Sequence, residues 1–276
     1  MMGYLLGVYE KSMPGTFTLK EKLACAKAAG FDYMEISIDE TDEKLSRLDW
    51  DNAVRRELVD AMWEIGLPIK SMCLSGHRKY PLGSLEQDTA RRSLEIMEKA
   101  VVLAGELGVR VIQLAGYDEY YRPSTEKTRE NFEVNLRKSV EIAAKHGVIL
   151  AFETMETEFM DTVGKAEYYV EKINSPYLKI YPDVGNVTNA MVKYHQEILT
   201  DFEKGRGNIV AAHLKATRPG VYRDMLFGEG HVDFPLIAGW LRENGVGMYV
   251  AEFWYKQGQE PLEYLKQANA FLRQYL

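Results

Sequence analysis

Short apolar runs alternate with longer amphipathic stretches along the chain. Between the short runs, apolar residues recur at helical spacing, as at Leu94, Met97 and Val101. The short runs are rich in Val, Ile, Leu, Tyr or Met, which is typical of buried strands. They occupy residues 4–9, 32–38, 69–74, 110–115, 148–153, 178–183, 209–214 and 248–253. The pattern therefore predicts eight strands that alternate with helices.

Five of the predicted helices end at a glycine that is followed at once by an apolar residue. Glycine adopts the left-handed conformation at this position without the steric penalty that a Cβ atom brings. At the start of the first helix, Thr18-Leu-Lys-Glu21 has the capping-box pattern. The glycines that mark the helix ends are Gly30, Gly66, Gly108, Gly147 and Gly245.

Alternation of strands and helices requires a parallel sheet, and eight repeats in 276 residues fit a closed barrel better than an open doubly wound sheet. No GxGxxG motif follows an early strand, which argues against a dinucleotide-binding fold. We therefore expect one catalytic α/β domain, residues 1–276, folded as a (β/α)8 TIM barrel. The C-terminal ends of the strands meet at one face of such a barrel, so functional residues should lie there.

Composition and charge narrow the choice of partners and location. The chain is 46% hydrophobic and 27% charged, which is typical of a folded globular domain. Its net charge of −7 repels phosphate backbones, so we expect no nucleic-acid partner. Cys25 and Cys73 lie in apolar segments, which suits buried thiols in the reduced state. We see no signal-peptide pattern and no run of about 18 apolar residues, and expect a cytoplasmic protein without membrane contact.

Four potential metal ligands stand at the predicted C-terminal ends of strands five to eight: Glu153, Asp183, His213 and Glu252. A single acidic residue after a strand is usually a helix N-cap, and a single histidine there usually has a structural role. Four such residues at the ends of adjacent strands are better explained by one shared site than by four separate roles. Ionisable groups at the ends of buried strands are costly to desolvate unless they are paired, and a shared cation compensates all four.

The ligand set indicates the class of metal but not its identity. Three carboxylates and one imidazole form a mainly oxygen site that suits manganese, magnesium or cobalt, and zinc also accepts these ligands. We therefore predict one divalent metal ion, Mn, Zn, Co or Mg. Four protein ligands leave positions open for two oxygens of a substrate.

Longer motifs around these residues resemble a known family. The four ligands and the sequence Phe227-Gly-Glu-Gly-His-Val-Asp-Phe234 are similar to the xylose-isomerase-like superfamily, which includes ketose 3-epimerases, hydroxypyruvate isomerase and endonuclease IV. Residues 6–11, 71–78, 112–118 and 181–186 resemble more closely the L-ribulose-5-phosphate 3-epimerase (L-xylulose-5-phosphate 3-epimerase) family of pentose and ascorbate catabolism. The resemblance extends over essentially the whole chain and also suggests a homodimer.

The resemblance implies that Glu153, Asp183, His213 and Glu252 bind the metal, and that Glu153 and Glu252 also form the acid-base pair. Chemistry agrees with this assignment, because the C3 proton of a ketose 5-phosphate lies α to a carbonyl and a chelating metal stabilises the enediolate. Inversion at C3 needs one base on each face, and strands five and eight lie far apart around the barrel. We therefore predict an isomerase that epimerises a small phosphorylated ketose.

The substrate phosphate needs fixed donors near the same face. The loops after strands three and seven supply backbone amides, hydroxyls and cations. Asn186 has two interpretations, as a substrate contact or as a cap of the next helix. Lys79 and Arg223 are explained equally well as phosphate contacts and as ordinary surface residues. The predicted substrate and phosphate residues are Ser75, His77, Arg78, Asn186, Lys215 and Arg218.

Two alternatives remain open, and the residues argue against a third, a DNA-repair endonuclease. Another sugar or sugar-phosphate isomerase, acting on a hexulose 6-phosphate or on hydroxypyruvate, would use the same scaffold. A DNA-repair endonuclease needs a histidine-rich cluster of several zinc ions, but Gln113 and Asn186 stand where that family places histidines. A non-catalytic sugar-binding barrel would show no turnover and a stability that is indifferent to chelators.

Overall fold

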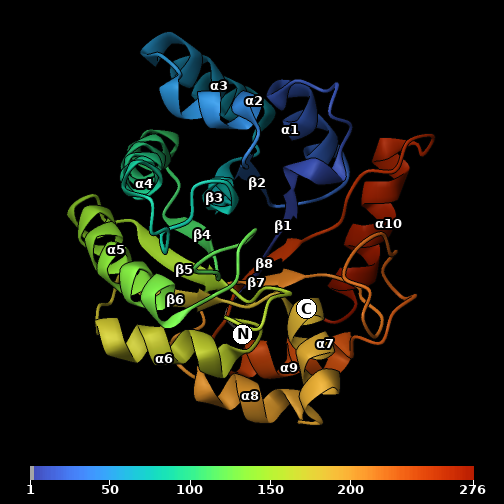
Figure 1. The fold of residues 1–276 in the computed structure, drawn as a ribbon. Helices are drawn as coiled ribbons and strands as arrows, with labels where there is room; N and C mark the ends of the chain where they lie inside the picture. The colour runs from blue at the N-terminus through green and yellow to red at the C-terminus, as the bar shows by residue number, and fades with distance from the viewer. Residues whose placement is uncertain (1–2) are drawn as a thin grey trace.

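The computed structural model describes residues 3–276, which form a barrel of parallel strands surrounded by helices (Figure 1). The sheet order is β6-β5-β4-β3-β2-β1-β8-β7. Backbone hydrogen bonds between Ile180 and the segment from Asn208 to Val210 link the two edges, so the barrel is nearly closed. The predicted TIM-barrel fold is confirmed. The strands are β1 (Leu5–Tyr9), β2 (Tyr33–Ile38), β3 (Ile69–Leu74), β4 (Val111–Ala115), β5 (Ile149–Glu153), β6 (Leu178–Tyr181), β7 (Ala212–Leu214) and β8 (Met248–Ala251).

Helices fill every connection between successive strands. They are α1 (Leu19–Ala28), α2 (Asp42–Leu45), α3 (Asn52–Ile65), α4 (Gln87–Leu107), α5 (Glu126–Lys145), α6 (Val163–Ile173), α7 (Val184–Tyr194), α8 (Ile198–Lys204) and α9 (Phe234–Glu243), with α10 (Pro261–Arg273) after the last strand. Short 3₁₀ turns cover Glu10–Ser12, Ser46–Asp49 and Gly76–Arg78. The capping box of α1 forms as predicted, and all five predicted helix-end glycines have φ between 65° and 87°.

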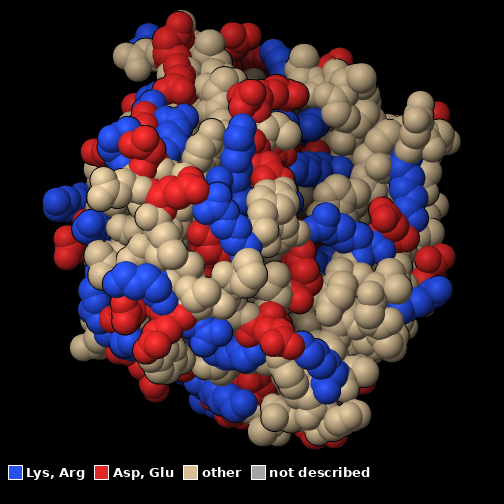
Figure 2. All heavy atoms as spheres, in the orientation of Figure 1, with Lys and Arg blue, Asp and Glu red and all other residues tan. Residues whose placement is uncertain are grey.

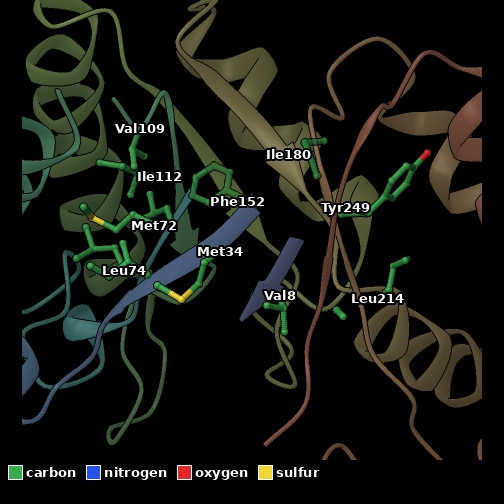
Figure 3. Packing of buried hydrophobic residues seen from close by; sticks show 14 of the residues in the cluster. Val8, Met34, Met72, Leu74, Val109, Ile112, Phe152, Ile180, Leu214 and Tyr249 are labelled. Carbon is green, nitrogen blue, oxygen red and sulfur yellow. The ribbon is translucent and has the colours of Figure 1, made fainter. Parts of the chain in front are cut away.

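Alternation along the strands divides the buried residues into two groups. Met34, Met72 and Phe152 lie on the outer face of the barrel, where they pack in the large core under the helices (Figure 3). Their neighbours point inward, and Tyr33, Cys73 and other inner residues form a separate small cluster. Because side chains alternate with period two, Glu35, Glu153 and Glu252 belong to the inner set.

Three of the four residues predicted to stand last in their strands occupy a different position in the structure. Glu153 is the last residue of β5, but β6 ends at Tyr181 because Pro182 has no N–H to donate. Asp183 follows and pairs with His213 in an isolated bridge. His213 lies in the middle of β7, and Glu252 comes one residue after β8. All four nevertheless reach the same end of the barrel.

The surface carries both signs of charge. Acidic and basic side chains are mixed over the face seen in Figure 2, without a continuous basic track across it. Among residues 3–276, no helix is long and apolar enough to cross a lipid bilayer.

Candidate active site

The four predicted metal ligands meet inside one end of the barrel. One ligand atom from each of Glu153, Asp183, His213 and Glu252 lies within 4.8 Å of the others, and all four side chains are buried. His213 Nδ1 is 3.3 Å from both Glu153 Oε1 and Glu252 Oε2. Strands far apart in the sequence thus bring together the donor set that was expected.

This arrangement fits a divalent cation. Three buried carboxylates around one imidazole repel one another unless positive charge lies between them. In addition, Asp183 Oδ2 and Glu252 Oε2 are buried and accept no hydrogen bond of ordinary geometry within the described part of the chain. Their contacts with the Lys215 ammonium and, for Glu252, with His213 still leave carboxylate lone pairs that can bind an ion.

Lys215 lies against the same carboxylates. Its Nζ is 2.5 Å from Asp183 Oδ2 and 3.4 Å from Glu252 Oε2, and its side chain is 6% exposed. The ammonium therefore neutralises part of the charge of the ligand cluster. A contact with the substrate phosphate would require this buried side chain to leave both carboxylates.

The site carries strongly perturbed pKa values. Burial raises the pKa of Asp183 and of Glu153 above their ordinary values, although Lys215 opposes this in both. Burial acts in the same direction on Glu252, but the positive charges of Lys215 and His213 outweigh it and hold its pKa well below the ordinary value. For His213, burial favours the neutral ring, but Glu35 and Glu252 outweigh it and raise the pKa.

Asp183 is fixed by the turn that begins α7. Its Oδ1 accepts a hydrogen bond from the Asn186 backbone N–H at 2.9 Å, so Asp183 is also the N-cap of that helix. The Asn186 side chain donates to the Thr154 carbonyl at 2.9 Å, and Thr154 Oγ1 accepts from the Asp183 backbone at 3.0 Å. Asn186 is therefore not the helix cap, which is Asp183; its side chain braces the ligand loop, and it also lines the cavity, where a substrate contact stays a prediction.

A cavity of about 80 Å³ lies above the ligands. The predicted residues Ser75, Arg78, Asn186 and Lys215 contribute to its wall, together with Glu153 and Glu252. The Arg78 guanidinium lies 4.5 Å from the centroid of the Tyr120 ring and 3.8 Å from Glu40 Oε1. Of these predicted binding residues, Arg78 offers the cavity a cation that is not bound to the metal ligands.

The structure does not bring His77 and Arg218 to the cavity wall. His77 lies in the 3₁₀ turn after β3, and its Nε2 faces the Ser93 carbonyl of α4 at 3.0 Å. It is 2% exposed. Arg218 donates through Nε to the Glu229 carbonyl at 3.1 Å, which directs it along its own loop.

Several cavity residues were not predicted from the sequence. Lys11 and Trp254 stand just beyond β1 and β8, so the same strand-end rule would have found them. Lys11 is held 2.5 Å from Asp39 Oδ2 at the rim. Glu35, on β2, was not among the predicted site residues, yet its Oε1 lies 2.7 Å from His213 Nε2.

Comparisons with known proteins agree with this architecture. Residues 23–275 match the family model described as xylose isomerase-like TIM barrel. The chain is 42% identical over 269 residues to L-ribulose-5-phosphate 3-epimerase UlaE from Escherichia coli O139:H28, a match that covers 97% of this chain and 93% of that protein.

Solved structures with lower identity show the same fold. D-psicose 3-epimerase with D-tagatose from Clostridium cellulolyticum H10 superposes with a TM-score of 0.82 at 15% identity, covering 99% of each chain. L-ribulose 3-epimerase superposes with a TM-score of 0.77 at 18% identity, covering 100% of this chain and 95% of the other. With the family model matching most of its length, this chain belongs to the xylose isomerase-like TIM barrel family.

Proposed function

We propose that this protein is a metal-dependent 3-epimerase that interconverts L-ribulose 5-phosphate and L-xylulose 5-phosphate. One observation carries the proposal. Two glutamates, from the β5 and β8 ends, belong to a buried group that could hold a metal ion, in a chain that is 42% identical over 97% of its length to an enzyme named for this reaction.

Glu153, Asp183, His213 and Glu252 would hold the cation. A divalent cation supplies Lewis-acid stabilisation of negative charge that develops on neighbouring substrate oxygens. Glu153 and Glu252 approach the cavity from strands that are separated by β6 and β7. One carboxylate removes the C3 proton from its face of the sugar, and the other returns a proton to the opposite face. Configuration at C3 is thereby inverted.

The cations near the rim support a phosphorylated substrate. Arg78 and Lys11 line the cavity above the ligands, and Arg223 contributes a further guanidinium whose side chain is 45% exposed. We assign the phosphate contact to Arg78, with Ser75 as a hydroxyl donor beside it. Lys215 is assigned to the carboxylate cluster, because its ammonium already contacts Asp183 and Glu252.

Proton NMR in D₂O tests the reaction directly. The metal-loaded enzyme is incubated with L-xylulose 5-phosphate, and in parallel with L-xylulose and with a hexulose 6-phosphate. Appearance of L-ribulose 5-phosphate with deuterium at C3 is the expected result. Exchange at C1 with formation of an aldose would instead identify an aldose-ketose isomerase, and no turnover of any sugar would refute the enzymatic assignment.

The two-base mechanism makes a sharper prediction for Glu153→Gln and Glu252→Gln. Each change keeps the shape of the side chain but removes one proton carrier, so complete epimerisation should fall by orders of magnitude. The remaining base can still exchange the C3 proton on its own face. The two variants should therefore exchange opposite epimers, one L-ribulose 5-phosphate and the other L-xylulose 5-phosphate.

Metal content of both variants must be measured first, because each glutamate is also a proposed ligand. If both metal-loaded variants exchanged the same epimer, or if either inverted C3 at nearly the parent rate, Glu153 and Glu252 would not be the two bases.

Two further properties stay predictions. Cys25 and Cys73 are both free thiols, which agrees with the cytoplasmic location that we propose. A homodimer is suggested by the family resemblance, and sedimentation of the purified protein would test it.

A further inference from the structure

We propose that Glu35 is a positioning residue of the metal centre, which holds His213 with its Nδ1 directed at the other ligands. This inference rests on the proposed metal site and concerns a residue outside the ligand set. Glu35 lies on the inner face of β2 and is 0% exposed. Its Oε1 is 2.7 Å from His213 Nε2.

The contact spans the interior of the barrel. β2 and β7 are not neighbours, because β1 and β8 lie between them in the sheet. Glu35 therefore reaches across the barrel to the back of the imidazole ring. Its other oxygen, Oε2, accepts hydrogen bonds from Ser71 Oγ at 2.7 Å and from Tyr181 Oη at 3.0 Å. Two hydroxyl donors leave Oε1 as the acceptor for the ring N–H.

The hydrogen bond selects which ring nitrogen faces the metal ligands. When Nε2–H donates to Glu35, the lone pair is on Nδ1, the atom that lies 3.3 Å from both Glu153 and Glu252. The Tyr181 ring packs edge-on against the imidazole, with centroids 4.9 Å apart, and limits its rotation further. A carboxylate behind a ligating histidine fixes its orientation and makes it a stronger donor to the metal.

The test measures the affinity for Mn²⁺ alone, without substrate, by counting free Mn²⁺ from its electron paramagnetic resonance signal. Glu35→Gln keeps the size of the side chain but replaces a charged acceptor with a neutral one. We expect the dissociation constant for Mn²⁺ to rise about 10- to 100-fold. Ser71→Ala is the matched control, because it removes a hydrogen bond to Oε2 of the same carboxylate and leaves the His213 contact in place. Its dissociation constant should stay within about threefold of the parent value.

A double-mutant cycle separates positioning from a general effect on the fold. If Glu35 acts through His213, then Glu35→Gln should weaken Mn²⁺ binding in the parent protein but not in a His213→Ala background. An equal loss in both backgrounds would overturn the inference, as would parent-like affinity of the single variant. Circular dichroism checks that each variant is folded. If Glu35→Gln does not fold, Glu35→Asp, which keeps the charge but withdraws the oxygen from Nε2, takes its place in the cycle.

These outcomes are distinct from failure of the proposed function. A parent protein that bound no divalent ion or epimerised no ketose would refute the metal-dependent 3-epimerase. The role of Glu35 fails when the parent binds Mn²⁺ tightly and the cycle shows no coupling between Glu35 and His213.

Discussion

Replacing His77 with Gln should remove part of the acid sensitivity of the fold. His77 is buried, its Nε2 contacts the Ser93 carbonyl, and its Nδ1 has no partner among residues 3–276. Burial lowers the pKa of this imidazole from 6.5 to about 4, although the Ser93 contact opposes the shift. Glutamine places an N–H donor where Nε2 lies and does not titrate near neutral pH, so His77→Gln can keep the contact with Ser93.

The sign and size of the effect follow from proton linkage. The folded protein holds His77 neutral, whereas the unfolded chain protonates it below about pH 6.5. Its contribution to stability is therefore complete above pH 6.5 and is lost as the pH falls toward 4. A shift from 6.5 to about 4 corresponds to about 3.4 kcal/mol in total. About 2 kcal/mol of this should already be lost at pH 5.

Urea unfolding at pH 8 and pH 5, with chelator present, measures this difference. Between the two values, the parent should lose about 2 kcal/mol more of its free energy of unfolding than His77→Gln does. His146→Gln changes an exposed histidine and should follow the parent. Equal losses in the parent and in His77→Gln would refute the buried neutral imidazole. A selective loss of activity on the phosphorylated ketose would instead support the phosphate role predicted from the sequence.

Three further predictions concern the site. Asp183→Asn should lose bound metal and turnover together, because one anionic ligand is removed; full metal content by elemental analysis with full turnover would contradict the ligand set. Arg78→Met should lower kcat/KM for the phosphorylated ketose about tenfold or more and hardly affect the free ketose, whereas equal losses on both would assign it to structure. Lys215→Met should lower kcat/KM for both substrates, because its ammonium contacts Asp183 and Glu252; a loss confined to the phosphorylated ketose would return it to the phosphate site.

The convergence of Glu153, Asp183, His213 and Glu252 was predictable because strand geometry places them at one end of the barrel. A side chain at an inner-facing position near the C-terminal end of a strand points into the barrel, regardless of the conformation of the loop that follows. Glu153 and Glu252 obey this rule directly. Asp183 lies beyond the end of β6, but Pro182 and the N-terminus of α7 hold it in register. The strand periodicity and the helix cap that place these side chains depend on residues close together in the sequence, so they can be inferred from the sequence.

The loop side chains that reach the cavity were harder to predict, because the direction of a loop side chain depends on tertiary contacts. His77 and Arg78 are adjacent in one 3₁₀ turn, yet His77 turns toward α4 and Arg78 toward the cavity. Nothing in the residue types separates them. Arg218 was predicted from its proximity to β7, but the Glu229 carbonyl draws it away. The direction of a side chain in such a turn depends on contacts with residues that are distant in the sequence.

The balance of buried charge explains why Lys215 contacts the clustered carboxylates. In the metal-loaded site, the ligand carboxylates of Glu153, Asp183 and Glu252 would be ionised, and His213 would be neutral because a ligating nitrogen carries no proton. Three negative charges are one more than a divalent cation neutralises. The buried ammonium of Lys215 removes one of them and contacts Asp183 and Glu252 directly. Moving it to the phosphate would leave that excess uncompensated in a buried site, which is costly. Recognition of the phosphate is therefore better served by Arg78, whose guanidinium carries no part of this balance.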